Sequence, residues 1–270
     1  MIEKQINSPR GTVYYWTNEL TSPQKLAIVF CHGLTADHTL FDKQVEHLSA
    51  HFKLITWDYP LHGKSRPYQE FSFANVNKEL LAILEQEHIE KIILVGQSAG
   101  GYIAQSFISE HADKVVGFIG IGTTPFGKSY YKKSELFWIK HFATIPRLYP
   151  YRYYCKTSAK AITTTVEARN SMYDSLIRLG KQGILKAASA VYGEFLKIED
   201  EVQFNCPVLI TYGEHDNTGY IKKYCKSWGE KTGFPVKVIS NASHNANYDN
   251  YEEFNELLLT FVQSIFENRN

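Results

Sequence analysis

The fold is decided by the stretch Lys91-Ile-Ile-Leu-Val95-Gly96-Gln97-Ser98-Ala99-Gly100. Its first five residues predict a strand buried in a parallel sheet, and residues 99–110 predict a helix. A glycine–x–serine–x–glycine pattern between a strand and a helix is typical of a strained turn that exposes the serine hydroxyl. Gly96 and Gly100 fit this interpretation because side chains at those positions would clash in so tight a turn. Ser98 is therefore a candidate nucleophile.

Short apolar runs alternate with helix-like segments along the rest of the chain. The runs that predict strands are Leu26–Cys31, Lys53–Trp57, Lys91–Val95, Val115–Ile121, Pro207–Tyr212 and Pro235–Ile239. Between and after them, residues 73–88 and 251–266 place apolar side chains at the spacing of one helix face. This alternation predicts an α/β fold, a parallel sheet covered by helices on both faces.

One long segment interrupts the alternation. Residues 123–196 contain no convincing core strand and read as helix and turn, interrupted by three prolines. We expect a helical insertion, or cap, at 123–196, and a core domain built from residues 1–122 and 197–270.

Composition excludes several classes of protein. The 270 residues are 44% hydrophobic and carry a net charge of +1, which argues against a disordered chain and against a nucleic-acid partner. No run approaches the roughly 18 apolar residues of a membrane span, and we expect no signal peptide. The four cysteines are scattered and the ten histidines lack metal-site spacing, so we expect free thiols, no metal and a cytoplasmic protein.

A serine nucleophile needs a base, and the base needs a carboxylate. His244 follows the last predicted strand, where the loop can carry it over Ser98. Asp216 follows the preceding strand by a short turn and is preferred to Glu214 and Asp249. The resulting order of serine, aspartate and histidine along the chain matches one known arrangement of a Ser-His-Asp triad.

Catalysis of acyl transfer also needs backbone donors for the developing negative charge. Ala99, directly after the nucleophile, offers one amide, and Leu34, in the loop after the first predicted strand, is the expected second donor. His32 and Gly33 precede Leu34, and we interpret His32 as shaping that loop and not as the base. The histidines interpreted as solvated surface residues are His38, His47, His51, His88, His111 and His141.

These residues together resemble the α/β-hydrolase superfamily over nearly the whole chain, from about residue 25 to 266. The matching segments are His32-Gly33, Asp58-Tyr-Pro-Leu-His-Gly63-Lys-Ser65, residues 96–100, Asp216 and His244. The resemblance implies about eight mostly parallel strands, a cap inserted after the sixth strand, a Ser-Asp-His triad and no cofactor. Leu61 departs from the family pattern D-x-x-G-x-G-x-S, in which glycine holds that position.

The leading hypothesis is a serine hydrolase, of carboxylesterase or lipase type, that cleaves small or medium carboxylic esters through an acyl-enzyme. A carbon–carbon bond hydrolase or a thioesterase with the same triad is the alternative among enzymes. A member that binds a ligand without catalysis is the alternative outside them. The sequence indicates neither the physiological substrate nor the oligomeric state.

The near-neutral total charge conceals an uneven distribution. The segment 123–196 holds twelve Lys or Arg and four Asp or Glu, so the remainder of the chain is acidic. Aromatic residues are interleaved with the basic ones. Three interpretations stay open: a solvated outer face with aromatics packed inward, a pocket rim that attracts anionic substrates, and transient contact with an anionic lipid surface, without stable insertion into a membrane.

Overall fold

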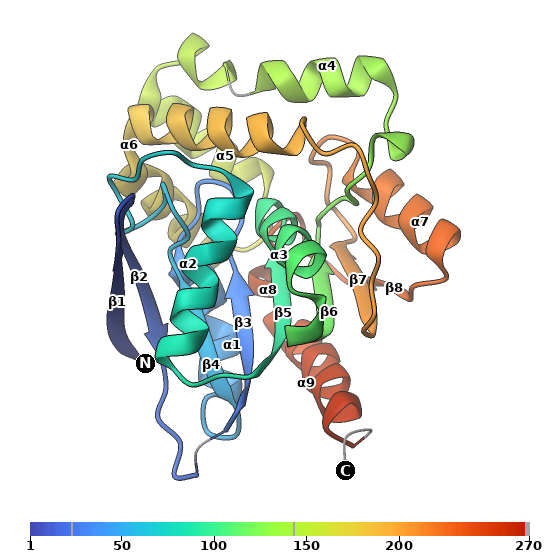
Figure 1. Ribbon diagram of the computed structural model, residues 1–270. Helices are drawn as coiled ribbons and strands as arrows, with labels where there is room; N and C mark the ends of the chain where they lie inside the picture. The colour runs from blue at the N-terminus through green and yellow to red at the C-terminus, as the bar shows by residue number, and fades with distance from the viewer. Residues whose placement is uncertain (23, 143, 268–270) are drawn as a thin grey trace.

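The computed structural model describes residues 1–22, 24–142 and 144–267. Within these residues eight strands form one sheet in the order β1-β2-β4-β3-β5-β6-β7-β8 (Figure 1). Strands β3 to β8 are parallel, whereas β1 and β2 form an antiparallel hairpin at one edge. The strands are β1 (Ile2–Ser8), β2 (Gly11–Thr17), β3 (Leu26–Cys31), β4 (Lys53–Trp57), β5 (Lys91–Gln97), β6 (Val115–Ile121), β7 (Val208–Gly213) and β8 (Val236–Ile239).

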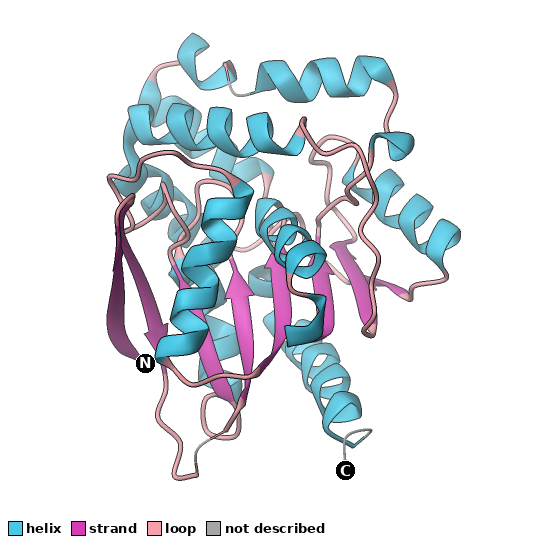
Figure 2. Cartoon of the chain, viewed as in Figure 1, coloured by secondary structure: helices cyan, strands magenta, loops and turns pink. Residues whose placement is uncertain are grey.

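Helices cover both faces of this sheet (Figure 2). The α-helices of the described residues are α1 (Asp42–Leu48), α2 (Phe73–Gln86), α3 (Ala99–Glu110), α4 (Lys133–Phe142), α5 (Tyr151–Ala161), α6 (Val166–Phe195), α7 (Ile221–Thr232), α8 (Ala246–Asp249) and α9 (Tyr251–Glu267). Residues of α2, α3 and α7 share the hydrophobic core on one face, and residues of α1, α8 and α9 share the core on the other. None of the helices in the described residues combines the length and the apolar character that a membrane span requires.

The fold expected from the sequence is confirmed. All six apolar runs are strands, with ends that differ by at most two residues from those predicted. The hairpin of β1 and β2 supplies the other two strands that the resemblance implied. Residue patterning did not indicate β1 because most of its side chains are exposed, so its sequence IEKQINS has little apolar periodicity.

The helical segment follows β6, as expected, and its helices α4, α5 and α6 lie across the carboxyl end of the sheet (Figure 1). Short 3-10 turns lie before it and within it, among them η4 (Ile145–Leu148). The division of the chain into separate core and cap domains at these boundaries stays a prediction. Hereafter residues 123–196 are called the cap.

Helix α6 is broken at Gly180, which takes φ +78° and ψ +158°. A helix end leaves its last four carbonyls without intrahelical donors, and these are the carbonyls of residues 176–179. The hydroxyl of Tyr151 donates to the first two at 2.8 and 2.9 Å. The guanidinium of Arg66, from the loop after β4, donates to Leu179 at 2.7 Å and to Arg178 at 3.1 Å. The break is therefore satisfied by one side chain of the cap and one of the core.

Replacing Arg66 tests this attachment. We expect Arg66→Ala to lower the free energy of unfolding by about 1–2 kcal/mol, because two carbonyls lose a charged donor. We also expect faster proteolytic cleavage near Gly180. The matched control is Arg152→Ala, at an exposed position of α5. Urea denaturation and limited proteolysis measure both effects, and equal behaviour of the two variants would contradict the assignment.

Candidate active site

Ser98 lies in the turn between β5 and α3 with φ +50° and ψ −119°, in the left-handed region that side chains rarely adopt. The two flanking glycines leave no room for a side chain. A Cβ added at Gly96 would lie 2.6 Å from the Cα of Gly101, and one added at Gly100 would lie 1.9 Å from the carbonyl oxygen of Cys31. The backbone of neighbouring segments thus imposes the strained turn predicted from the sequence.

The structure brings Ser98, His244 and Asp216 together in one hydrogen-bonded chain. The Nε2 of His244 lies 2.9 Å from the Ser98 Oγ, and its Nδ1 lies 2.8 Å from the Asp216 Oδ2. The imidazole and the carboxylate are buried, whereas the serine is partly exposed. The three residues follow β5, β7 and β8, whose carboxyl ends meet at one edge of the sheet.

The pKa of Asp216 favours an ionised carboxylate. Burial alone would raise this pKa, but the imidazole of His244 and the amide of Thr218, which donates to Oδ1 at 2.8 Å, hold it below its usual range. An ionised acceptor at Nδ1 keeps the proton on that nitrogen and leaves Nε2 free to accept from Ser98. Glu214, the first competitor for this role, is exposed and accepts the amide of Asn241.

Two backbone segments border the serine hydroxyl. Ala99 is the first residue of α3, so its amide has no acceptor within the helix. Gly33 packs directly on the turn, because a Cβ added to it would lie 3.3 Å from the Ser98 Cβ. Leu34 is the next residue of that loop. Donation by Ala99 and Leu34 to an oxyanion stays a prediction.

Gln97 joins three parts of the site. Its Nε2 donates to the carbonyl of His244 at 3.0 Å and to the Oδ1 of Asn245 at 3.4 Å. Its Oε1 occupies the space beside Gly33, only 2.0 Å from where a Cβ of that residue would be. The side chain therefore links the serine turn to the histidine loop and to the loop after β3. The sequence pattern indicates that Gln97 lies in the turn but carries no signal for this contact.

Asp249 is the second alternative to Asp216 as the partner of His244. Its carboxylate instead holds the loop that carries His244. Its Oδ2 accepts the amide of Ser243 at 2.9 Å, and its Oδ1 accepts the amides of residues 164–165 at 2.9 and 3.2 Å. The amide of Asn245 also donates to the carbonyl of Ile162. The loop that carries His244 is thus bonded directly to the turn between α5 and α6 of the cap.

His32 is fully buried and does not belong to the hydrogen-bonded chain. Its Nδ1 lies 2.8 Å from the carbonyl oxygen of Gly33, and its ring stacks on Tyr59 with centroids 4.3 Å apart. Burial lowers its pKa, so the ring is neutral and Nδ1–H donates to that carbonyl. This geometry fits the interpretation that His32 shapes the loop.

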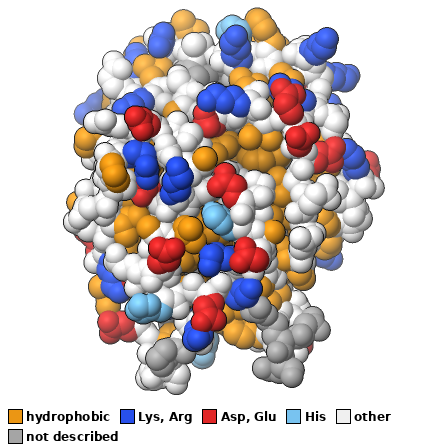
Figure 3. Space-filling view, viewed as in Figure 1, with side chains coloured by type: hydrophobic (Ala, Val, Ile, Leu, Met, Phe, Trp, Pro, Cys, Tyr) orange, Lys and Arg blue, Asp and Glu red, His pale blue; other side chains and the backbone are white. Residues whose placement is uncertain are grey.

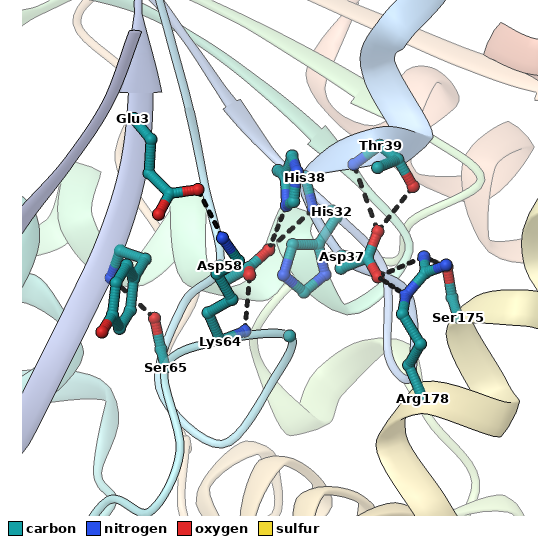
Figure 4. A network of polar contacts seen from close by, with 12 residues as sticks. Glu3, His32, Asp37, His38, Thr39, Asp58, Lys64, Ser65, Ser175 and Arg178 are labelled. Atoms are coloured by element: carbon teal, nitrogen blue, oxygen red, sulfur yellow. Dashed lines mark hydrogen bonds and ion pairs between the residues drawn. The ribbon is translucent and has the colours of Figure 1, made fainter.

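The interpretation of His38 as a solvated residue is wrong. Asp58 accepts the His38 amide at 2.8 Å, its Nδ1 at 2.9 Å and the amide of Lys64 at 2.7 Å (Figure 4). The His38 ring also stacks on Trp16 with centroids 3.4 Å apart. A lone histidine in a sequence carries no signal for such a partner, because Asp58 is twenty residues away.

The loop after β4 tolerates the unusual residue at position 61. Leu61 takes φ +74°, the conformation for which the family pattern has glycine, and its side chain is buried. Backbone strain of this kind costs on the order of 1–3 kcal/mol, and burial of a leucine offsets a similar amount.

Comparison with known proteins decides the family. A model of the alpha/beta hydrolase fold matches residues 27–251. The chain belongs to the α/β-hydrolase family. This α/β hydrolase is 23% identical to the AB hydrolase superfamily protein YisY of Bacillus subtilis, over 88% of this chain and 91% of that protein. It is 29% identical to the pimeloyl-[acyl-carrier protein] methyl ester esterase of Wigglesworthia glossinidia brevipalpis, but over only 42% of this chain and 41% of that enzyme.

Among solved structures, a thermophilic esterase from Thermogutta terrifontis superposes on this α/β hydrolase with a TM-score of 0.80. The two chains are 16% identical, and the match covers 98% of this chain and 99% of the other. At this identity the likeness establishes the fold alone. Within the described residues no three His, Cys, Asp or Glu side chains gather as a metal site would require. The expectation that the α/β hydrolase needs no cofactor stays a prediction.

The close packing of the turn predicts a large effect of one methyl group. We expect Gly100→Ala to lower the free energy of unfolding by at least about 3 kcal/mol, because the added Cβ meets backbone that cannot move aside. Gly193→Ala is the matched control: it lies within α6 with nothing within 4 Å, and we expect it to stabilise by about 0.5–1 kcal/mol. Urea denaturation measures both, and a small effect at Gly100 would contradict the geometry.

The lowered pKa of Asp216 predicts a pH-dependent contribution to stability. A carboxylate with a lowered pKa in the folded state stabilises the fold above its unfolded-state value of about 3.9. That contribution is lost as the pH falls through the folded-state pKa. We therefore expect Asp216→Asn to be less stable than the parent at pH 7, with the difference shrinking below about pH 4. Urea denaturation from pH 7 to 3 measures this, and parallel curves would contradict it.

Proposed function

We propose that this α/β hydrolase is a serine hydrolase that cleaves carboxylic esters of small or medium acyl groups through an acyl-enzyme intermediate. The observation that carries the proposal is the continuous chain from the Ser98 Oγ through His244 to a buried Asp216, with both distances below 3 Å. A structural turn has no need of a buried carboxylate and imidazole aligned on a strained, partly exposed serine.

In the first step the Ser98 Oγ attacks the ester carbonyl while its proton passes to the Nε2 of His244. The electron pair of the carbonyl moves to its oxygen, which the amides of Leu34 and Ala99 would stabilise. Loss of one such donor typically costs about 2.7–4 kcal/mol of transition-state stabilisation. Asp216 keeps the imidazole in the required tautomer and stabilises its positive charge.

In the second step the tetrahedral intermediate collapses and its carbon–oxygen bond to the alcohol breaks. The imidazolium of His244 gives its proton to the leaving alkoxide, so the alcohol departs and the acyl group stays on Ser98. Water then attacks the acyl-enzyme, its proton passes to His244, and the returning proton restores the Ser98 hydroxyl as the carboxylic acid leaves. No group beyond the chain and water is consumed.

The names of two similar proteins support an oxygen ester as the substrate. The methyl ester esterase and the Thermogutta esterase are both named for ester cleavage. Thioester and carbon–carbon bond cleavage would use the same three residues. Acyl chain length is therefore best examined with a series of esters, and the bond cleaved with a thioester and a 1,3-diketone of the same acyl group.

Loss of the Ser98 hydroxyl gives the decisive experiment. We expect Ser98→Ala to lower kcat for p-nitrophenyl esters by at least about 10³-fold, because the nucleophile is removed while the fold remains. A fluorophosphonate probe should label the parent and not the variant. Ser109→Ala, on the same helix α3 but away from His244, is the matched control and should behave as the parent.

The outcomes separate the competing functions. Retained ester turnover in Ser98→Ala would refute the assignment of the nucleophile. A parent protein that binds esters but takes no label would favour the ligand-binding alternative. Faster cleavage of the thioester or the diketone than of the matched ester would replace the substrate class and leave the nucleophile in place.

A further inference from the structure

Large apolar side chains are exposed on the outer side of the cap. Six of the ten such side chains in the described residues belong to it, although it is little more than a quarter of the chain. They are Phe137, Trp138, Leu148, Tyr149, Tyr153 and Val166, and Trp138 is 68% exposed. All but the last lie in residues 133–142 and 144–156, which comprise α4, η4 and the start of α5 and are called the outer cap segment.

Exposed cations accompany these side chains. The basic residues of the outer cap segment are Lys133, Lys140, Arg147, Arg152 and Lys156, and all five are exposed. Its one acidic residue, Glu135, is buried and paired with Lys223 of α7 at 2.8 Å. Among the described residues of the segment itself, no exposed carboxylate offsets this positive charge. Figure 3 shows blue and orange side chains together along the upper rim, with red ones below them.

A hollow between α4 and α6 belongs to the same surface. It has a volume of about 570 Å³, with Lys133 and Lys140 at its wall and Phe137 and Leu196 among its apolar lining. Cations beside an apolar floor suit a ligand that has a negative headgroup and an apolar chain. Free acidic peptides would satisfy the lysines but would leave the exposed aromatic rings in water.

A second copy of the chain is a weaker occupant. Lysine is depleted in the core of protein–protein interfaces, whereas here lysines and arginines are interspersed with the apolar side chains. Aromatic side chains next to basic ones are typical of helices that lie in the interface of a membrane with anionic lipid. The five exposed apolar side chains fall within one short stretch of sequence, whereas surface hydrophobes are normally scattered singly.

We propose that the outer cap segment binds the surface of a bilayer that contains anionic phospholipid, with Phe137, Trp138 and Leu148 entering the headgroup region. The basic side chains contact lipid phosphates. The protein lies on the membrane and does not span it. Membrane binding does not depend on the proposed hydrolase activity, because binding to vesicles is measured without any ester substrate.

Trp138 supplies a built-in reporter of binding. The other three tryptophans, Trp16, Trp57 and Trp228, are at most 8% exposed, so quenching by acrylamide arises from Trp138. The probe is vesicles of phosphatidylcholine in which about one third is phosphatidylglycerol. We expect a blue shift and protection of Trp138 with these vesicles, much less with pure phosphatidylcholine, and reversal by high salt.

Matched variants separate the cap from the rest of the surface. Phe137 lies on the cap and Tyr220 on the core, and both side chains are 57% exposed. Phe137→Ala should weaken co-sedimentation with the vesicles, whereas Tyr220→Ala should not. Lys140→Glu should weaken it at least about fivefold, whereas Lys78→Glu, an equal change of charge on α2, should not. Circular dichroism and urea denaturation check that the variants are folded.

Three results would overturn the proposal. The first is unchanged quenching of Trp138 with anionic vesicles. The second is an equal effect of the cap variants and their core controls. The third is a concentration-dependent dimer that Phe137→Ala abolishes in a protein that does not bind vesicles, which would assign the segment to contact between two copies of the chain.

Discussion

The left-handed backbone of Ser98 is the constraint on which the rest of the site depends. Holding a serine at φ +50° costs free energy, and the surrounding packing must prevent the turn from relaxing. The amide of Ser98 donates to the carbonyl of Ile121 on β6 at 2.8 Å, so the neighbouring strand fixes the turn from one side. The close backbone at Gly96 and Gly100 fixes it from behind. The partly exposed hydroxyl is a consequence of this confinement.

The histidine loop is held by side chains and by backbone bonds, since the amide of Asn245 donates to Ile162 and the amide of His215 donates to Ala242. Gln97 bonds it to the serine turn, and Asp249 bonds it to the start of α6. The cap has further attachments to the core, since Arg178 of α6 pairs with Asp37 at 2.6 Å (Figure 4) and Arg66 donates to the carbonyls at the break in α6. The contacts of Asp249 and Arg178 end on loops that also carry site residues. A movement of the cap would therefore shift the loops that carry His244 and Gly33.

Sequence patterns predicted the parts of this site that depend on strand ends. Ser98, Asp216 and His244 each follow an apolar run, and parallel strands bring their carboxyl ends together, so strand order was enough to find them. Gln97 and Asp249 act through contacts made across loops, which no local pattern encodes. For the same reason, the sequence does not predict the break in α6. The donor to the Leu179 carbonyl is Arg66, which lies more than a hundred residues away, and no local pattern around Gly180 indicates it.

The outer cap segment differs from the rest of the cap because its large apolar side chains are exposed to water. The inner side of the cap is accounted for by stability, because Leu176, Leu179 and Val191 are buried in the two hydrophobic cores. The exposed side chains of Trp138 and Leu148 do not stabilise the fold, because apolar surface contributes to stability only when it leaves water. The core is acidic and the cap basic, and Glu135 of the cap pairs with Lys223 of the core, whereas the five basic residues of the outer cap segment are exposed. Folding alone thus explains the inner face of the cap but gives no reason for the composition of its outer face.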